Sequence, residues 1–296
     1  MKIKNLVLFV VLAFFFLSCT DNDDDIVEEV IPPTEAQLIV KFKFDPTQIR
    51  LNNLGQPSSV TAGNAAQSPN FNTIASHYVE LAPSATTQLG SGTILYRGQE
   101  TTTGGLPAFD FSKAKIVAEG EAFLSIPLSQ IKAGSYEWVR CSLSYQNYDI
   151  TVRSAGVDYV GTLASFVGTR TYITTHYIGN YPFVVNGNRD QGYWAFGLQG
   201  VNYSTFGQTP AGATTVPNPI ASTSPIPANS CVVTGKFASN LVITGTETTN
   251  IEVTLSLSTN NSFEWNEVNI DGKYEPSAGE NVADMGLRGL IPSYVR

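Results

Sequence analysis

Hydrophobic residues recur at every second position in three separate segments of this chain. In residues 38–44, leucine, valine and two phenylalanines alternate with isoleucine and two lysines, and segments 139–145 and 251–257 repeat the pattern. Because successive side chains of a β-strand point to opposite faces, this spacing gives each segment one apolar face. The chain is therefore predicted to build its core from sheets.

Other segments have the same strand-like character but are shorter or less regular. They are residues 77–81, 93–97, 121–126, 156–166, 171–178, 193–198, and 232–237 with 241–244. A short helix is compatible with residues 111–117, but no segment carries a 3.6-residue apolar stripe over three turns. The predicted fold class is all-β, an antiparallel β-sandwich with long loops and little helix.

Residues 36–296 are predicted to form a single β-sandwich domain. Its least strand-like part is a Pro/Ser/Thr-rich excursion at residues 207–230. A split into two domains at this excursion is the alternative interpretation. Only about three strands are predicted after it, which is few for an independent core.

The first 19 residues carry a targeting pattern. Lys2 and Lys4 precede an apolar run at residues 6–17, and Ser18-Cys19 follows it. A helix needs about 20 residues to cross a bilayer, so this run is interpreted as a cleaved signal peptide, residues 1–18. It resembles the signal and lipobox of bacterial lipoproteins, which implies that Cys19 carries the lipid and anchors the chain to a membrane. An ordinary secretory signal with a chance cysteine is the alternative.

An acidic segment follows Cys19 directly. Residues 19–35 contain seven carboxylates and a Pro-Pro pair at 32–33. Like charges repel and stay solvated, so the segment is predicted to be a flexible tether. An acidic run beside a lipidated cysteine also resembles the export signal of surface lipoproteins of the Bacteroidetes group. The resemblance implies an outer-membrane location with the protein exposed on the cell surface.

The charge balance of the remaining chain argues against a nucleic-acid partner. The chain has 25 acidic and 17 basic residues. Without the tether and signal, 18 acidic and 15 basic residues remain, a net charge near −3. Nucleic-acid binding requires clustered positive charge, which this balance does not offer.

Two cysteines remain after Cys19. Cys141 and Cys231 form an even pair, which in an exported protein is a candidate disulfide. Two buried free thiols are the alternative, because spacing alone does not establish contact between them.

A pattern of oxygen-bearing side chains lies near the C-terminus. Residues 267–278 resemble the calcium loop of EF-hand and dockerin-like proteins, in which alternate oxygens and a glycine wrap a hard cation. The resemblance implies a Ca²⁺ ligand set of Glu267, Asn269, Asp271, Lys273 through its carbonyl, Glu275 and Glu280. The pattern departs from the family because Ala278 stands where a bidentate glutamate is expected and Glu280 comes two residues late. A plain Asx-Gly turn at residues 269–272 is the alternative.

Signatures of catalysis are sparse. The sequence contains no Gly-x-Ser-x-Gly and no His-Glu-x-x-His motif, and its two histidines, His77 and His176, fall in strand-like segments. Carboxylate pairs that could hydrolyse a glycoside are Glu119 with Glu121 and Glu264 with Glu267. The aromatic residues Tyr181, Tyr203 and Phe206 fall in less regular segments, where they could stack on sugar rings or a partner.

These observations predict a cell-surface lipoprotein that acts as a binding or adhesion module for a glycan or a protein partner. No catalytic residues are predicted, and calcium is the one cofactor considered. Two alternatives stay open. The first is an exported hydrolase, or a metal-handling protein that uses His77 and His176, and the second is a structural component of the envelope.

Overall fold

Residues 38–44 form the strand that the alternation predicts. In the computed structural model, β1 (Gln37–Asp45) buries Leu38, Val40, Phe42 and Phe44 on one face. The structure describes residues 35–51, 56–84, 87–209, 232–285 and 287–296. The signal peptide, Cys19, Cys231 and residues 210–230 of the predicted excursion therefore lie outside the described residues, as does the tether apart from Glu35.

The first sheet has the order β19-β16-β1-β8. Its other members are β8 (Ala122–Pro127), β16 (Ile251–Ser258) and β19 (Arg288–Val295). β1 and β16 run parallel with Leu38 opposite Ile251, and the remaining pairs in this sheet are antiparallel. Two segments more than 200 residues apart thus share one ladder at the centre of the sheet.

A larger sheet is organised around β9 (Gly134–Ser154), a strand of 21 residues. β3 (Asn70–Ala82) pairs with residues 138–149 of β9. β15 (Val232–Ile243) and β10 (Val157–Phe166) pair with residues 134–142 and 145–154. Residues of β9 that pair with β15 or β10 also pair with β3. Because β3 occupies one edge of β9, β15 and β10 both pair with the other edge, one after the other along the strand. The sheet continues with β4 (Thr93–Arg97), β7 (Ile116–Val117), β13 (Tyr193–Leu198) and β14 (Ser204–Gln208).

The first half of β9 and the first sheet enclose the largest core. Val139 and Leu143 of β9 belong to the same buried cluster as Phe42 and Leu255. Cys141 also lies in this cluster, with its Sγ 3.3 Å from the Oγ of Ser76. Because Cys231 is outside the described residues, its pairing with Cys141 stays a prediction.

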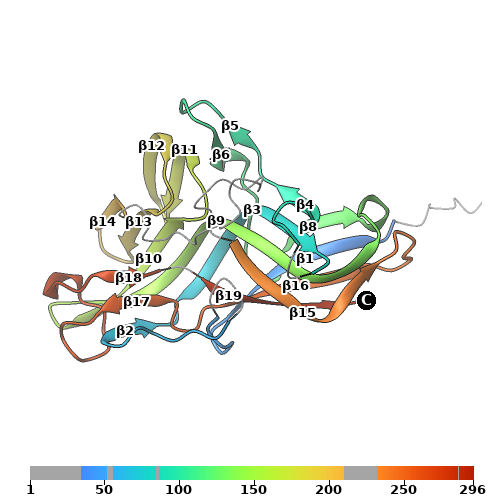
Figure 1. Cartoon of the computed structure of the whole chain (residues 1–296). Coiled ribbons are helices and arrows are strands. Elements are labelled where there is room, and N and C mark those ends of the chain that lie inside the picture. The colour runs from blue at the N-terminus through green and yellow to red at the C-terminus, as the bar shows by residue number, and fades with distance from the viewer. Residues whose placement is uncertain (1–34, 52–55, 85–86, 210–231, 286) are drawn as a thin grey trace, which may run out of the picture. The chain divides into compact units, whose positions relative to one another are not determined.

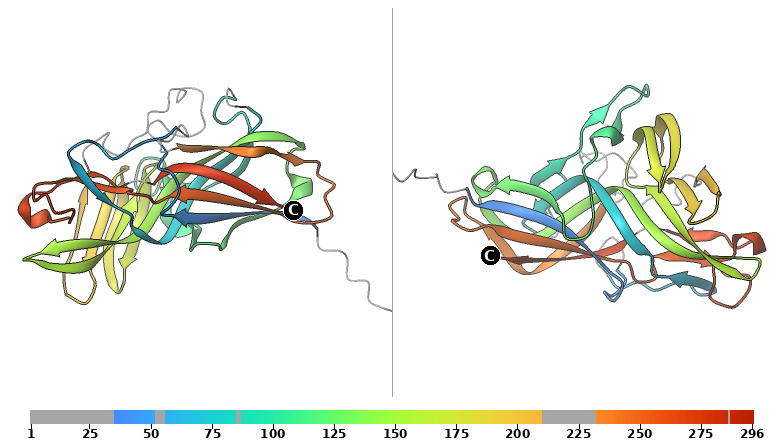
Figure 2. Two further views of the ribbon diagram at one scale, coloured as in Figure 1. Left: turned by 90° about the horizontal axis from the view of Figure 1, so that it is seen from below. Right: turned by 180° about the vertical axis from the view of Figure 1, so that it is seen from behind.

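The second half of β9 has a packing layer on each face (Figures 1 and 2). Tyr145 packs with the β12-β11-β6-β5 sheet on one side, whereas Tyr148 and Ile150 pack with the β18-β17-β2 sheet on the other. The strands of these sheets are β2 (Asn64–Gln67), β5 (Glu100–Thr101), β6 (Ala108–Asp110), β11 (Thr171–Ile178), β12 (Tyr181–Arg189), β17 (Phe263–Asn266) and β18 (Val282–Asp284). The all-β sandwich prediction is confirmed, with a third layer over part of the larger sheet.

Helical structure in the described residues is limited to three single 3-10 turns. They are Phe111–Lys113, Leu128–Gln130 and Pro276–Ala278. The short helix considered at residues 111–117 is thus one turn followed by β7. Across the described ranges, no helix combines the length and the apolar character needed to cross a membrane. Residues from Glu35 onward cluster into one compact unit.

Candidate functional site

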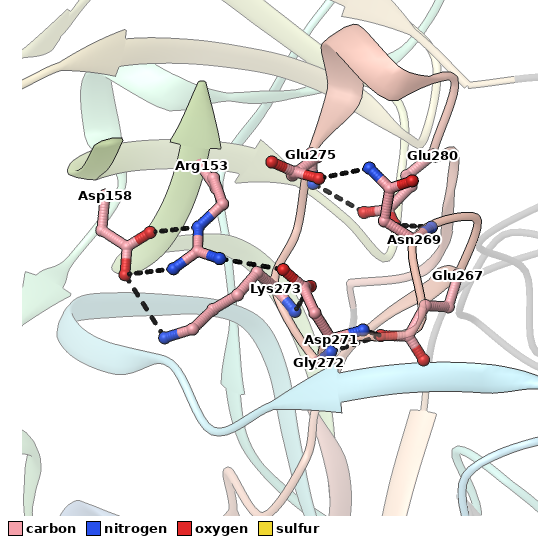
Figure 3. A network of polar contacts seen from close by, with 9 residues as sticks. All are labelled: Arg153, Asp158, Glu267, Asn269, Asp271, Gly272, Lys273, Glu275 and Glu280. Carbon is pink, nitrogen blue, oxygen red and sulfur yellow. Dashed lines mark hydrogen bonds and ion pairs between the residues drawn. The ribbon is translucent and has the colours of Figure 1, made fainter. Parts of the chain in front are cut away.

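The six predicted calcium ligands lie together on the loop that joins β17 to β18 (Figure 3). Oε1 of Glu267 accepts hydrogen bonds from the backbone N–H groups of Asp271 and Gly272. Asp271 accepts from the backbone N–H of Lys273 at 2.9 Å, and its other oxygen accepts from Nη1 of Arg153 at 2.8 Å. The carboxylates of Glu267 and Asp271 thus accept hydrogen bonds from backbone N–H groups of their own loop, and Asp271 also accepts one from the Arg153 side chain on β9.

Glu280 is the centre of this loop. It is 2% exposed, and its two oxygens accept hydrogen bonds from the backbone N–H groups of Val268 at 3.0 Å, Asn269 at 3.2 Å and Glu275 at 2.6 Å. The side-chain amide of Asn269 donates to the carboxylate of Glu275. A buried carboxylate with three donors needs no cation to satisfy its oxygens.

Calcium binding at this loop stays a prediction. Among the described residues, no group of three or more His, Cys, Asp or Glu side chains is arranged to hold a metal ion. Lys273 turns its ammonium toward Asp158 at 3.3 Å. The glycine that follows Asp271 has φ of 69°, which agrees with the alternative of a tight turn. A bound ion would have to displace the N–H donors that the carboxylates now hold.

A polar cavity of about 350 Å³ lies at the base of the same hairpin. Glu264 of β17 and Asp284 of β18 face each other across the ladder, and both line the cavity. Arg50 enters from the segment after β1 and completes the floor, while Ser58, Ser59 and Thr61 form the rim. The cavity thus joins a buried floor of charged groups to an exposed rim of hydroxyls.

The floor of the cavity is a buried ion-pair network. Nη2 of Arg50 lies 2.9 Å from Oε2 of Glu264 and 3.4 Å from Oδ2 of Asp284. Oε1 of Glu264 accepts hydrogen bonds from the backbone N–H of Thr61 at 3.0 Å and from Nδ2 of Asn64 at 2.6 Å. Burial opposes ionisation of Glu264, but the hydrogen bonds from Asn64, Arg50 and Thr61 outweigh it and lower its pKa to about 2.

Arg50 has donors left over. A guanidinium carries five N–H groups, and only Nη2 of Arg50 is engaged. Its Nε and Nη1 have no hydrogen-bond partner within the described part of the chain, although the side chain is 7% exposed. Leaving a buried N–H unpaired costs about 1–3 kcal/mol, and no oxygen of the described residues offsets this cost at Nε and Nη1.

The other residues considered for chemistry lie apart in separate environments. His77 of β3 is buried beside Phe109, and His176 of β11 is buried between aromatic rings. Glu119 accepts from the backbone N–H of Phe44, and Glu121 accepts from that of Ala118. Glu264 belongs to the cavity floor, whereas Glu267 belongs to the loop. In the described structure, each of these carboxylates has a local structural partner.

Several aromatic side chains are exposed at the edge of the larger sheet. Phe206 on β14 is 62% exposed, and its ring lies 6.2 Å from that of Phe183 and 6.4 Å from that of Tyr193. Arg189 stacks over Tyr193 at 5.3 Å. Tyr203, just before β14, is 52% exposed. Tyr181 is partly buried and donates a hydrogen bond to the carbonyl of Val201. Of the three aromatics singled out by the sequence, two therefore face solvent.

Sequence spacing does not link the residues of the cavity. Arg50 comes from a segment without alternation, and it meets Glu264 across 214 residues. Asp284 follows the predicted calcium loop but belongs to no motif. Comparisons with protein-family models, curated proteins and solved structures found no match. The role of the site is therefore inferred from the geometry of its side chains.

Proposed function

We propose that the chain is a lipid-anchored binding module on the outer face of the outer membrane, and that it binds a glycan. The observation that carries the binding role is the exposed aromatic edge of the larger sheet, which consists of Phe206 on β14, 62% exposed, and the rings of Phe183 and Tyr193 beside it. A large apolar side chain that stays exposed next to further aromatic rings marks an interaction surface more often than an isolated one does.

A glycan suits this aromatic edge. The C–H faces of sugar rings stack on aromatic rings, and Phe206 continues an aromatic cluster that begins in the core at Tyr193. Arg189 beside this cluster provides a hydrogen-bond donor next to the stacking surface. Charged residues are only 14% of the chain, which favours a neutral partner over a strongly charged one.

Replacing Phe206 by alanine is expected to weaken glycan binding by about tenfold or more, as for other exposed aromatic anchors. The measurement is isothermal titration of the full chain, purified in detergent, against a panel of soluble polysaccharides. Val157→Ala is the matched control, because Val157 is 51% exposed in the same sheet but outside the aromatic cluster. Absence of heat with every polysaccharide, or equal losses in both variants, would reject the proposed glycan partner.

Replacing Cys19 by alanine is expected to move the protein from the membrane fraction to the soluble fraction. The anchor proposal requires the thiol as the site of acylation, and the acyl groups are then what attaches the mature chain to the membrane. Fractionation of cells and mass spectrometry of the N-terminal peptide measure this. Ser18→Ala is the control that keeps the cysteine and a small residue before it. A wild-type protein that is unacylated or begins elsewhere would contradict the anchor.

A further inference from the structure

One strand connects the body of this protein to the proposed membrane anchor. The chain passes from Cys19 to Glu35, the first described residue, and β1 begins two residues later at Gln37. With an acyl anchor at Cys19, a partner that pulls on the body therefore puts the whole load on the N-terminal end of β1.

Backbone ladders hold β1 on both of its edges. On one edge, residues 38–45 pair in parallel with residues 251–258 of β16. On the other edge, residues 37–41 pair with residues 122–127 of β8 in the antiparallel sense. The strand that receives the load is thus an inner strand of its sheet, with neighbours on two sides.

Further contacts extend the hold on β1 beyond the β8 ladder. The carbonyl of Phe42 accepts a hydrogen bond from the backbone N–H of Gly120 at 3.0 Å, and the backbone N–H of Phe44 donates to Oε2 of Glu119 at 3.3 Å. One face of the strand lies in the largest core, where its side chains are at most 7% exposed. These side chains are Leu38, Val40, Phe42 and Phe44.

A load between anchor and partner acts along β1. The strand starts at the end of the molecule where Glu35 lies, and it runs toward the end that contains β14 and the turn between β9 and β10 (Figures 1 and 2). A partner bound at Phe206 on β14 therefore pulls mainly along the strand axis. The hydrogen bonds of both ladders lie across this axis, so the strand leaves the sheet only if they break together. Bonds that are loaded together resist a larger force than bonds that are loaded one at a time.

The C-terminal strand of the same sheet offers the opposite loading geometry. Val295 of β19 lies opposite Glu252 of β16, so the C-terminal end of β19 is at the same end of the sheet as Glu35. Only β16 separates β1 from β19 in this sheet, which places their axes about 10 Å apart. A pull between Glu35 and Arg296 acts across the strands and peels β19 from β16 one residue pair after another.

We propose that β1 is a force-bearing clamp, by which the anchored protein keeps its fold while it holds a partner under tension. The proposal rests on the anchor at Cys19 in the proposed function and adds load bearing to that function. Resistance to force depends on the rate of unfolding rather than on the equilibrium free energy, so the direction of the load matters.

Single-molecule pulling on the full mature chain in detergent compares the two directions. An azide-bearing amino acid replaces Val30 as the common attachment point, and a second one replaces either Val157, the exposed first residue of β10, or Arg296. DNA handles coupled to the azides leave the cysteines untouched. At equal loading rate, rupture between residues 30 and 157 is expected to need a force at least about twofold higher than between residues 30 and 296.

Two matched variants locate the resistance. Val40 on β1 and Val233 on β15 are each 1% exposed in the same core cluster, but β15 pairs with β9 and not with β1. Under constant load between residues 30 and 157, Val40→Ala is expected to shorten the lifetime of the fold about tenfold, and Val233→Ala by no more than about twofold. Urea unfolding compares the equilibrium stabilities of the two variants.

Two results would overturn the clamp. They are a rupture force between residues 30 and 157 that is no higher than between residues 30 and 296, and lifetimes that shorten equally in both variants. The first comparison uses the wild-type core, so it stands even where an alanine variant does not fold. The pull needs neither an acyl group nor a glycan. A weak clamp in a protein acylated at Cys19 would leave the proposed function intact and reject the clamp, and a strong clamp in an unacylated protein would do the reverse.

Discussion

Acidification from about pH 6.5 to about pH 4 is expected to lower the free energy of unfolding by about 3 kcal/mol for each of the two histidines. Burial lowers the pKa of both His77 and His176 from 6.5 to about 4. In this window an unfolded histidine takes up a proton while the folded one stays neutral, so the unfolded state binds more protons. Stability is therefore complete above about pH 6.5 and is lost as the pH falls through about 4.

The surroundings of His176 explain why its charged form is disfavoured. The imidazole is 2% exposed and stacks on Phe183, with ring centroids 5.1 Å apart and planes at 9°. Phe166 and Tyr193 contact it edge-on. The phenol of Tyr193 is 3.5 Å from Nε2, which is a long contact, so a proton added to this ring would have little to stabilise it. His77 is similarly enclosed at 7% exposure.

Urea unfolding followed by tryptophan fluorescence at several pH values measures the effect. His176→Phe is the matched variant, because a phenyl ring can take the place of the stacked imidazole and does not titrate. It is expected to remove about half of the loss, since two histidines contribute equally. Glu264, with its pKa lowered from 4.5 to about 2, adds a loss only below about pH 4.5. Equal pH dependence in wild type and variant would show that His176 is not responsible.

Strands with one apolar face could be predicted from the sequence alone. The predicted ranges 93–97, 171–178 and 193–198 coincide with β4, β11 and β13, and in β13 every second side chain is buried, as its alternation predicts. The strands β12 and β19 were not predicted, because residues that are uncommon in strands interrupt both of them. β12 contains Pro182 and an Asn186 with φ of 47°, and β19 contains a proline that its position at the sheet edge tolerates.

Pairing and the cavity could not be predicted in this way. The parallel partnership of β1 with β16 depends on which distant apolar faces meet, and alternation carries no information on that choice. The oxygen pattern at residues 267–280 lies on the loop between β17 and β18, and calcium binding there stays a prediction. The burial of Arg50 could not be predicted from the sequence, because a charged residue outside any alternating segment is expected to be exposed.

Removal of the Glu80 carboxylate is expected to cost about 3–5 kcal/mol of stability, since it leaves the charge of Arg140 buried without a partner. Glu80 of β3 is fully buried, and it faces Arg140 of β9 directly across the ladder. Oε2 of Glu80 lies 3.6 Å from Nη1 of Arg140. The pair therefore joins the two strands on which the larger sheet is built.

The same pair also holds the connection between β3 and β4. Oε1 of Glu80 accepts hydrogen bonds from the backbone N–H groups of Gly90 at 3.0 Å and Gly92 at 2.6 Å. Nη2 of Arg140 donates to the carbonyl of Thr87 at 2.6 Å. A Cβ on Gly92 would lie 2.2 Å from the carbonyl oxygen of Leu81, so only glycine allows this approach. Loss of the carboxylate would release these backbone groups as well as the charge.

A double-mutant cycle separates the ion pair from simple packing. Glu80→Met and Arg140→Met are each expected to be strongly destabilising, whereas the double variant should recover much of the loss because it leaves neither charge buried. Urea unfolding at neutral pH gives the four free energies. Lys41→Met with Glu252→Met is the control cycle, since this pair, at 2.6 Å, is partly exposed and should couple by no more than about 1 kcal/mol. Purely additive losses at Glu80 and Arg140 would mean that the two charges do not depend on each other, and that the loop contacts of each side chain account for its effect.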